Sequence, residues 1–355
     1  MEPMVKKPAE DTPLVGKGDE PAADSSGVEQ TKTLSAMFAL VAIAVSKTQL
    51  TALLFSDNKY PIAYSFYSCV VTMLMLVPVF VCVRSQWGVP VKGMFIKASP
   101  AGWYDYCGPL TLIVLFTSLD LGFTNIAISE MSVALVQCIL ATNPFWCILI
   151  ETLVRGKFQH FIIYLAVSGV VLGAILTSVS QVKPPSFVGL VCSFAAVLSS
   201  ATKYVFTHGA LRDFKGVLGP LSMLFWVDLL MCPFYIGWVL ARKGEIDFFT
   251  VSMPAMPPGT FVYCTIVAGL GGLRALTQYV VLLFVTATSM STANIFTQIL
   301  NILISMMWQH VDVTPMLIIG IVVVFLFVSI YTHLKTNKNA CGGIMLPNEP
   351  APAAP

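Results

Sequence analysis

Ten long apolar stretches, arranged as five followed by five, fill nearly all of the chain between Leu34 and Leu334. A helix of about 20 mostly apolar residues crosses the ~30 Å hydrocarbon core of a bilayer. The composition agrees, because 56% of the residues are hydrophobic and 11% are charged, whereas soluble domains carry roughly a quarter charged residues. The sequence therefore predicts an all-α membrane protein with ten transmembrane helices, and the lipid bilayer is its first expected partner.

Prolines and the lengths of the apolar runs give approximate helix boundaries. A proline is tolerated in the first turn of a helix, where its missing N–H has no partner to lose. Prolines stand at or near four predicted helix starts: Pro61, Pro109, Pro220 and Pro315. In chain order the predicted helices cover residues 34–55, 61–83, 109–127, 131–154, 161–179, 187–208, 220–241, 260–285, 289–309 and 315–334.

Both ends of the chain differ from the middle. Residues 1–33 and 335–355 are rich in Pro and Ala, and such segments bury too little apolar surface to fold. We expect two disordered cytosolic tails on either side of one ten-helix domain at 34–334. The first tail has no apolar stretch after a basic start and no Arg, so neither a signal peptide nor a transit peptide is predicted.

Basic residues in the loops predict the orientation, because cytosolic loops carry an excess of Lys and Arg. With ten helices, both termini lie on one side of the membrane. That side receives Lys32, Arg84, Lys92, Lys97, Arg155, Lys157, Arg212, Lys215, Lys335 and Lys338. The opposite side receives Lys59, Lys183, Arg242 and Lys243. Both termini are therefore predicted in the cytosol, which favours the Golgi or another endomembrane over a plastid envelope.

The division into five and five helices predicts an internal symmetry. Five is odd, so the second set enters the membrane from the opposite side, and the segments 34–179 and 187–334 become inverted repeats. A weak echo supports this, because residues 130–134 (EMSVA) and 289–293 (SMSTA) open corresponding helices. Transporters are often built from such repeats, with the substrate site near the midplane between them.

Five ionisable residues stand well inside the apolar runs: Lys47, Asp120, Lys203, Asp228 and Arg274. A charge at the bilayer centre is costly, so each is a candidate functional residue. Pairing only for assembly, of Lys47 with Asp120 or of Arg274 with Asp228, is the alternative, and Lys203 lies near enough to a helix end to snorkel. Three cations against two anions favour an anionic ligand, unless a buried Lys is deprotonated.

Polar and aromatic side chains extend the candidate site. The predicted fourth helix carries Gln137, Thr142 and Asn143, and the ninth carries Asn294, Thr297, Gln298 and Asn301, at spacings close to one turn. Tyr204, Tyr279 and Phe296 can stack on a base or sugar, with ordinary core packing as the alternative. The predicted substrate-binding residues are Lys47, Asp120, Gln137, Lys203, Tyr204, Arg274, Tyr279, Asn294, Thr297 and Gln298.

Short motifs along all ten helices carry a resemblance. Ser46 and Lys47 stand in the first helix, residues 118–125 read SLDLGFTN, and Pro144 follows SVA at 132–134. Residues 202–208 read TKYVFTH and residues 288–296 read TSMSTANIF. In order and spacing the chain resembles the triose-phosphate/nucleotide-sugar transporter branch of the drug/metabolite transporter superfamily.

The chain departs from that branch at the cations that hold phosphate. The resemblance places a Lys at the position of Leu140, and a Lys followed by Arg or Glu at Thr297 and Gln298. Lys47 and Lys203 remain at matching positions, and Arg274 is a candidate replacement for the lost charge. Two ligand types stay open: a less charged metabolite, or an anion held by Lys47, Lys203 and Arg274.

The leading hypothesis is a secondary transporter of a sugar-linked or small organic metabolite, working by alternating access as an antiporter. The alternative is a transport-inactive regulatory or scaffolding protein of the same fold. An intramembrane enzyme is not predicted, because no HExxH is present and the four His lie at helix ends. No metal site or cofactor is expected without a CxxC pair, and a net charge of +2 gives no reason to expect nucleic acid. A homodimer is left open.

Overall fold

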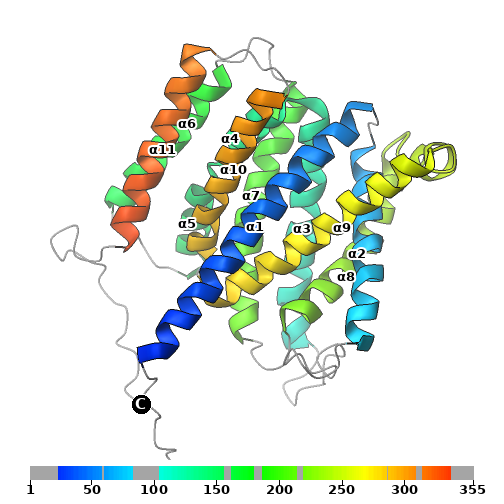
Figure 1. Ribbon diagram of the computed structural model, residues 1–355, viewed down its shortest axis with the longest axis horizontal. Coiled ribbons are helices and arrows are strands. Elements are labelled where there is room, and N and C mark those ends of the chain that lie inside the picture. The colour runs from blue at the N-terminus through cyan, green and yellow to red at the C-terminus, as the bar shows by residue number, and fades with distance from the viewer. Residues whose placement is uncertain are drawn as a thin grey trace, which may run out of the picture.

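The computed structural model describes residues 23–57, 60–82, 104–155, 161–179, 186–213, 219–285, 287–308 and 314–336, and within these residues the regular structure is helical, without strands. The helices pack into one bundle (Figure 1). They are α1 (Ala23–Asp57), α2 (Pro61–Cys82), α3 (Tyr104–Glu130), α4 (Val133–Leu140), α5 (Asn143–Arg155), α6 (Phe161–Val179), α7 (Phe187–Asp213), α8 (Pro220–Ala241), the π-helical turn η2 (Phe248–Ser252), α9 (Pro258–Phe284), α10 (Ala287–Trp308) and α11 (Pro315–Thr336).

Seven segments of the described chain are long and apolar enough to cross a membrane. They lie in α1, α2, α3, α4 with α5, α7, α8 and α9. Shorter apolar stretches occupy the remaining three long helices, at Phe161–Gly173, Asn294–Ser305 and Ile318–Tyr331. The protein is therefore an integral, multi-pass, all-helical membrane protein.

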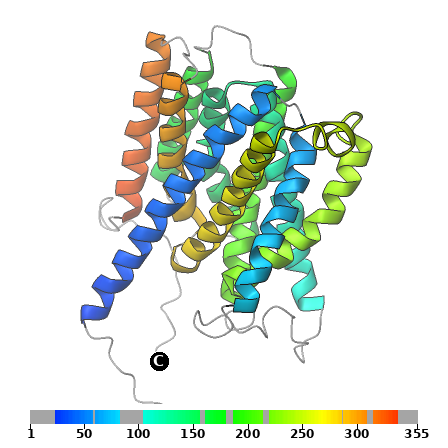
Figure 2. The same ribbon diagram turned by 45° about the vertical axis from the view of Figure 1, so that its right-hand side comes forward.

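Two predicted boundaries at helix starts are wrong. Helix α1 begins at Ala23, so residues 23–33 are helical rather than disordered, and this end projects beyond the neighbouring helices (Figures 1 and 2). Adding residues to an existing helix needs no new nucleation, which a composition argument overlooks. Pro109 lies inside α3, which begins at Tyr104, and not at its start. The rest of the predicted tails, residues 1–22 and 337–355, lie outside the described residues.

The predicted helix at 131–154 is two helices. The first, α4, begins at Val133 after the N-cap residue Ser132, whose side chain accepts from the Leu135 N–H, and it ends at Leu140. Pro144 explains the break, because it has no N–H to donate and its ring clashes with the carbonyl four residues earlier. The Thr142 hydroxyl bonds the Ile139 carbonyl at 2.8 Å within the turn. A discontinuous helix therefore enters the middle of the bundle.

Small residues set the closest helix contacts. Helices α6 and α11 lie side by side (Figures 1 and 2), and a Cβ on Gly169 would come within 2.2 Å of the Phe327 ring. A Cβ on Gly173 would meet the backbone nitrogen of Val324 at 2.8 Å. On α9, Gly272 lies against Thr72 of α2 in the same way. These glycines serve helix packing, which is the usual role of small residues in membrane bundles.

The connection between α8 and α9 is fixed to the start of α2. Glu245, whose residue exposure is 2%, accepts from the Ala63 N–H at 2.9 Å and faces Arg242 Nη1 at 3.4 Å. Phe248 of η2 packs on the rings of Tyr60 and Tyr67. A carboxylate satisfies free N–H groups at a helix start and interacts favourably with the helix dipole, so Glu245 caps α2 from a distant part of the chain.

We predict that Gly173→Ala lowers the stability of the bundle by about 1–3 kcal/mol, because the methyl group meets backbone that cannot move aside. Gly237→Ala is the matched control, since a Cβ there meets nothing within 4 Å and alanine favours helix. Thermal unfolding of both variants in detergent measures the difference. Equal melting temperatures for the two variants would contradict the close α6–α11 contact.

Glu245 generates a pH prediction. Burial raises the pKa of its carboxyl group above the usual value, against the lowering effects of the Ala63 N–H and Arg242. The folded protein then binds this proton more tightly than the unfolded chain does. Protonation of Glu245 therefore stabilises the fold, and this stabilisation is complete below the ordinary Glu pKa. It is lost as the pH rises through the raised pKa. Glu245→Gln should remove this slope from melting temperatures measured between about pH 4 and 7, and parallel profiles would refute the effect.

Candidate functional site

One cavity of about 130 Å³ lies in the middle of the bundle. Its lining residues come from α1 to α5 and from α7 to α10, and none of the described lining residues belongs to the outer pair α6 and α11. All ten sequence-predicted site residues line this cavity. The structure thus brings them together around one space, and their role in binding a substrate stays a prediction.

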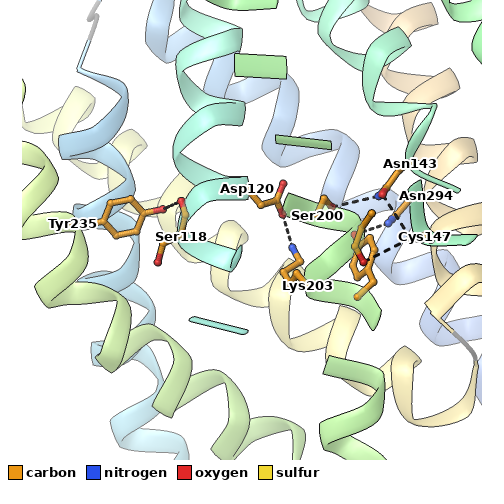
Figure 3. A network of polar contacts seen from close by, with 10 residues as sticks. Ser118, Asp120, Asn143, Cys147, Ser200, Lys203, Tyr235 and Asn294 are labelled. Carbon is orange, nitrogen blue, oxygen red and sulfur yellow. Dashed lines mark hydrogen bonds and ion pairs between the residues drawn. The ribbon is translucent and has the colours of Figure 1, made fainter. Parts of the chain in front are cut away.

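Lys203 of α7 forms an ion pair with Asp120 of α3. Lys203 Nζ lies 2.5 Å from Asp120 Oδ2, and both side chains are largely buried; Figure 3 shows the two groups pointing at each other. Lys203 therefore does not snorkel, and Asp120 is not the partner of Lys47. Helices α3 and α7 pack along each other, which places these two residues face to face.

Tyr204, the next residue of α7, also lines the cavity. The Asn294 amide donates to the Tyr204 hydroxyl at 2.7 Å, and Lys203 Nζ stands 5.0 Å from the centre of the Tyr204 ring. A neighbouring bond joins the Asn143 amide to the Ser200 hydroxyl at 3.3 Å. The polar groups of α5, α7 and α10 thus hold one another in place beside the ion pair (Figure 3).

Three charged residues of the cavity are left without an ion-pair partner among the described residues: Lys47, Arg274 and Asp228. The proposed pairing of Arg274 with Asp228 is not formed. Lys47 is 5% exposed and lies within electrostatic range of Arg274, which repels it, and of Asp120. Two like charges therefore face the same space.

The break between α4 and α5 faces α10. Gln298 Nε2 donates to the Leu140 carbonyl at 3.0 Å. Thr297 Oγ1 and Gln298 Oε1 are buried, and none of the described residues offers them a hydrogen bond. An uncharged part of the cavity wall therefore offers amide and hydroxyl groups beside the cationic part.

The family of the chain follows from its match to a family model. The model of the Triose-phosphate Transporter family matches residues 49–332. The chain belongs to the Triose-phosphate Transporter family. One solved crystal structure has the same fold. The two chains superpose with a TM-score of 0.59 and are 11% identical, and the match covers 86% of this chain and 97% of that chain.

The family resemblance gives the helix break a further meaning. Leu140 and Thr297, the two positions at which the resemblance implies cations, both line the cavity. Gln298, the neighbour of Thr297, bonds Leu140 directly. The two positions therefore lie at one place in the cavity wall, where this chain has neutral groups.

Sequence reasoning missed several lining residues. Asp228 stood out as a buried charge but was not placed in the site, and Ser68, Thr72, Thr117 and Gln278 were not considered. Gln278 lies one turn after Arg274, a spacing that could have indicated a shared face. Phe296 was a stacking candidate, but it is 56% exposed and does not line the cavity. Among the described residues, no group of three His, Cys, Asp or Glu is placed to hold a metal ion.

We predict that Lys203→Met lowers stability by roughly 3–5 kcal/mol, because it leaves the Asp120 carboxylate buried without a partner. Adding Asp120→Leu to Lys203→Met should restore most of that loss, since both charges are then gone. Thermal unfolding in detergent compares the single and double variants. If the double variant is no more stable than the single one, the ion pair is not what holds these side chains.

Proposed function

We propose that this protein is a secondary transporter of a sugar-linked or small organic metabolite, and that it works by alternating access as an antiporter. One observation carries the proposal: the central cavity is lined from both halves of the chain and holds Lys47 and Arg274 without ion-pair partners among the described residues. A cavity between two bundles that can move against each other is where transporters hold their substrates.

Helix contacts support two inverted repeats of five helices and ten membrane crossings. If the two halves are repeats, each helix of the first half has a counterpart in the second. The counterparts are α1 and α7, α2 and α8, α3 and α9, α4 with α5 and α10, and α6 and α11. The contacts α2–α8, α4–α10 and α6–α11 then map onto themselves, and α3–α7 maps onto α1–α9. The contact α2–α9 likewise maps onto α3–α8. Contacts of this kind are expected when a two-fold axis relates the repeats. Because each repeat crosses the membrane an odd number of times, the two repeats have inverted orientations.

The charges support an anionic substrate. The ion pair of Lys203 with Asp120 leaves two cations and one carboxylate, so the cavity carries a net positive charge when all five groups are ionised. Burying an unpaired cation in a membrane is costly, and an anion that enters the cavity offsets this cost. Phosphate and carboxylate groups match Arg geometry particularly well, so we assign Lys47 and Arg274 to an anionic group of the substrate.

The proposed orientation places both termini in the cytosol, and we propose an endomembrane such as the Golgi as the location. The basis of the orientation is the charge of the loops, and the organelle is proposed from the expectation that cytosolic termini favour an endomembrane. With this orientation the Glu245 cap on α2 lies at the non-cytosolic face, between the two repeats, where it holds that side of the bundle together.

An uptake screen in proteoliposomes tests the transport function. Purified folded protein is reconstituted, and uptake of nucleotide sugars, sugar phosphates and neutral metabolites is measured with and without a preloaded exchange partner. We expect saturable uptake of a metabolite that carries a sugar or an anionic group. Absence of uptake and exchange across all three classes would contradict transport and favour the regulatory or scaffolding alternative.

Arg274 gives a sharper prediction. Arg274→Gln should weaken binding of the anionic substrate roughly 10- to 100-fold, because it removes a charged hydrogen-bond donor. Leu140→Lys in that background should partly restore binding, since it returns a cation to the cavity. Lys243→Gln is the control, because Lys243 is an exposed cation of the α8–α9 connection. Affinity that is unchanged in Arg274→Gln would refute the compensation by Arg274.

A further inference from the structure

The helix break leaves one carbonyl group in need of a donor. Pro144 has no N–H, and the Leu140 carbonyl four residues earlier therefore loses its helical partner. None of the backbone hydrogen bonds around the described break uses that carbonyl, since the N–H groups of Ala141, Thr142 and Phe145 bond other residues. Gln298 Nε2 supplies the missing donor at 3.0 Å.

This bond fixes the orientation of the Gln298 amide. The nitrogen and oxygen of an amide are assigned from their partners, and the Leu140 carbonyl can only accept. Rotating the amide would bring two oxygen atoms together, so Oε1 must point away from Leu140. Gln298 is 7% exposed, and its Oε1 is buried at the cavity wall without a hydrogen-bond partner in the described part of the chain. A buried acceptor that is left unsatisfied is costly.

We propose that Gln298 is a specificity-determining residue whose Oε1 accepts a hydrogen bond from the substrate. The substrate must therefore carry a hydroxyl or N–H group at this place. Phosphate and carboxylate oxygens are acceptors, so they repel Oε1 rather than bond it. The inference rests on the proposed function and deepens it. Gln298 at the helix break then binds a neutral donor group of the substrate, while Lys47 and Arg274 bind its anionic group.

Other groups of the cavity fit a substrate with two chemically different ends. Within the described chain, Thr297 Oγ1, next to Gln298, is buried without a hydrogen-bond partner and can donate or accept. On α9, one turn from Arg274, Gln278 Nε2 is a buried donor that likewise bonds none of the described residues. The α9 wall thus offers donors to an acceptor-rich group, and the α10 wall offers a fixed acceptor. A sugar phosphate and a nucleoside monophosphate both have this division.

Binding of paired probes tests the inference. Hexose 6-phosphate is compared with its 2-, 3- and 4-deoxy forms, which lose one hydroxyl each, and uridine monophosphate is compared with its N3-methyl form, which loses the base N–H. In the wild-type protein we expect one of these deletions to weaken binding about tenfold. Which pair discriminates tells whether the donor is a sugar hydroxyl or a base N–H.

Two variants assign that discrimination to Gln298. Gln298→Met removes the acceptor, so both members of the pair should bind about equally. Gln298→Lys keeps a donor for the Leu140 carbonyl and presents only donors to the cavity, so it should lose the discrimination and bind inorganic phosphate more tightly. Gln49→Met is the control, because Gln49 is a buried amide that bonds Asn301 and Ser305 outside the cavity lining; it should keep the tenfold difference.

The outcomes separate this inference from the function beneath it. Two results would overturn the inference that Gln298 Oε1 accepts a hydrogen bond from the substrate. The first is discrimination between paired probes that survives in both Gln298 variants, and the second is a wild-type protein that binds the probes without discriminating between them. In either case water is the partner of Oε1. If the folded wild-type protein binds no probe of either series, the proposed transport of an anionic metabolite falls, and this substrate site falls with it.

Discussion

The ion pair between Lys203 and Asp120 is the interaction on which the rest of the site depends. Five ionisable groups line one cavity inside a membrane protein, where each charge is costly. The pair between α7 and α3 satisfies one cation and one carboxylate. Lys47 and Arg274 are thereby left to face the cavity together. In the proposed function these two cations hold an anionic group of the substrate, and the Asp228 carboxylate lines the same cavity.

A second constraint comes from Pro144. It divides one membrane crossing into α4 and α5 and frees the Leu140 carbonyl, which Gln298 of α10 then satisfies. The break therefore connects helices of the first and second halves of the chain at the cavity wall. In the family resemblance this place carries phosphate-binding cations, and here it carries neutral groups. The family fold is retained, Lys47 and Lys203 stand at positions that match the resemblance, and Arg274 of α9 is the candidate replacement for the lost charge.

Much of the fold could be predicted from sequence because the bilayer demands long apolar helices. The helices at 161–179 and 220–241 begin and end where the apolar runs do. The break before Pro144 was missed because its apolar run is continuous on both sides.

The ten site residues could be collected from buried charge and helical spacing. Their pairing could not, because three cations and two carboxylates allow several pairs, and only the packing of α3 on α7 selects Lys203 for Asp120. Asp228 and Gln278 were missed because the crossing of α8 and α9 decides that they reach the same cavity.

Exchange across a reconstituted membrane tests the central claim most directly. Proteoliposomes are loaded with a labelled anionic metabolite, and its efflux is measured with and without the same unlabelled metabolite outside. If the two repeats alternately expose one cavity whose free cations hold the substrate, external metabolite should accelerate efflux, and Lys47→Met should abolish the acceleration. Efflux that is the same with and without external metabolite, or acceleration that is undiminished in Lys47→Met, would contradict the account.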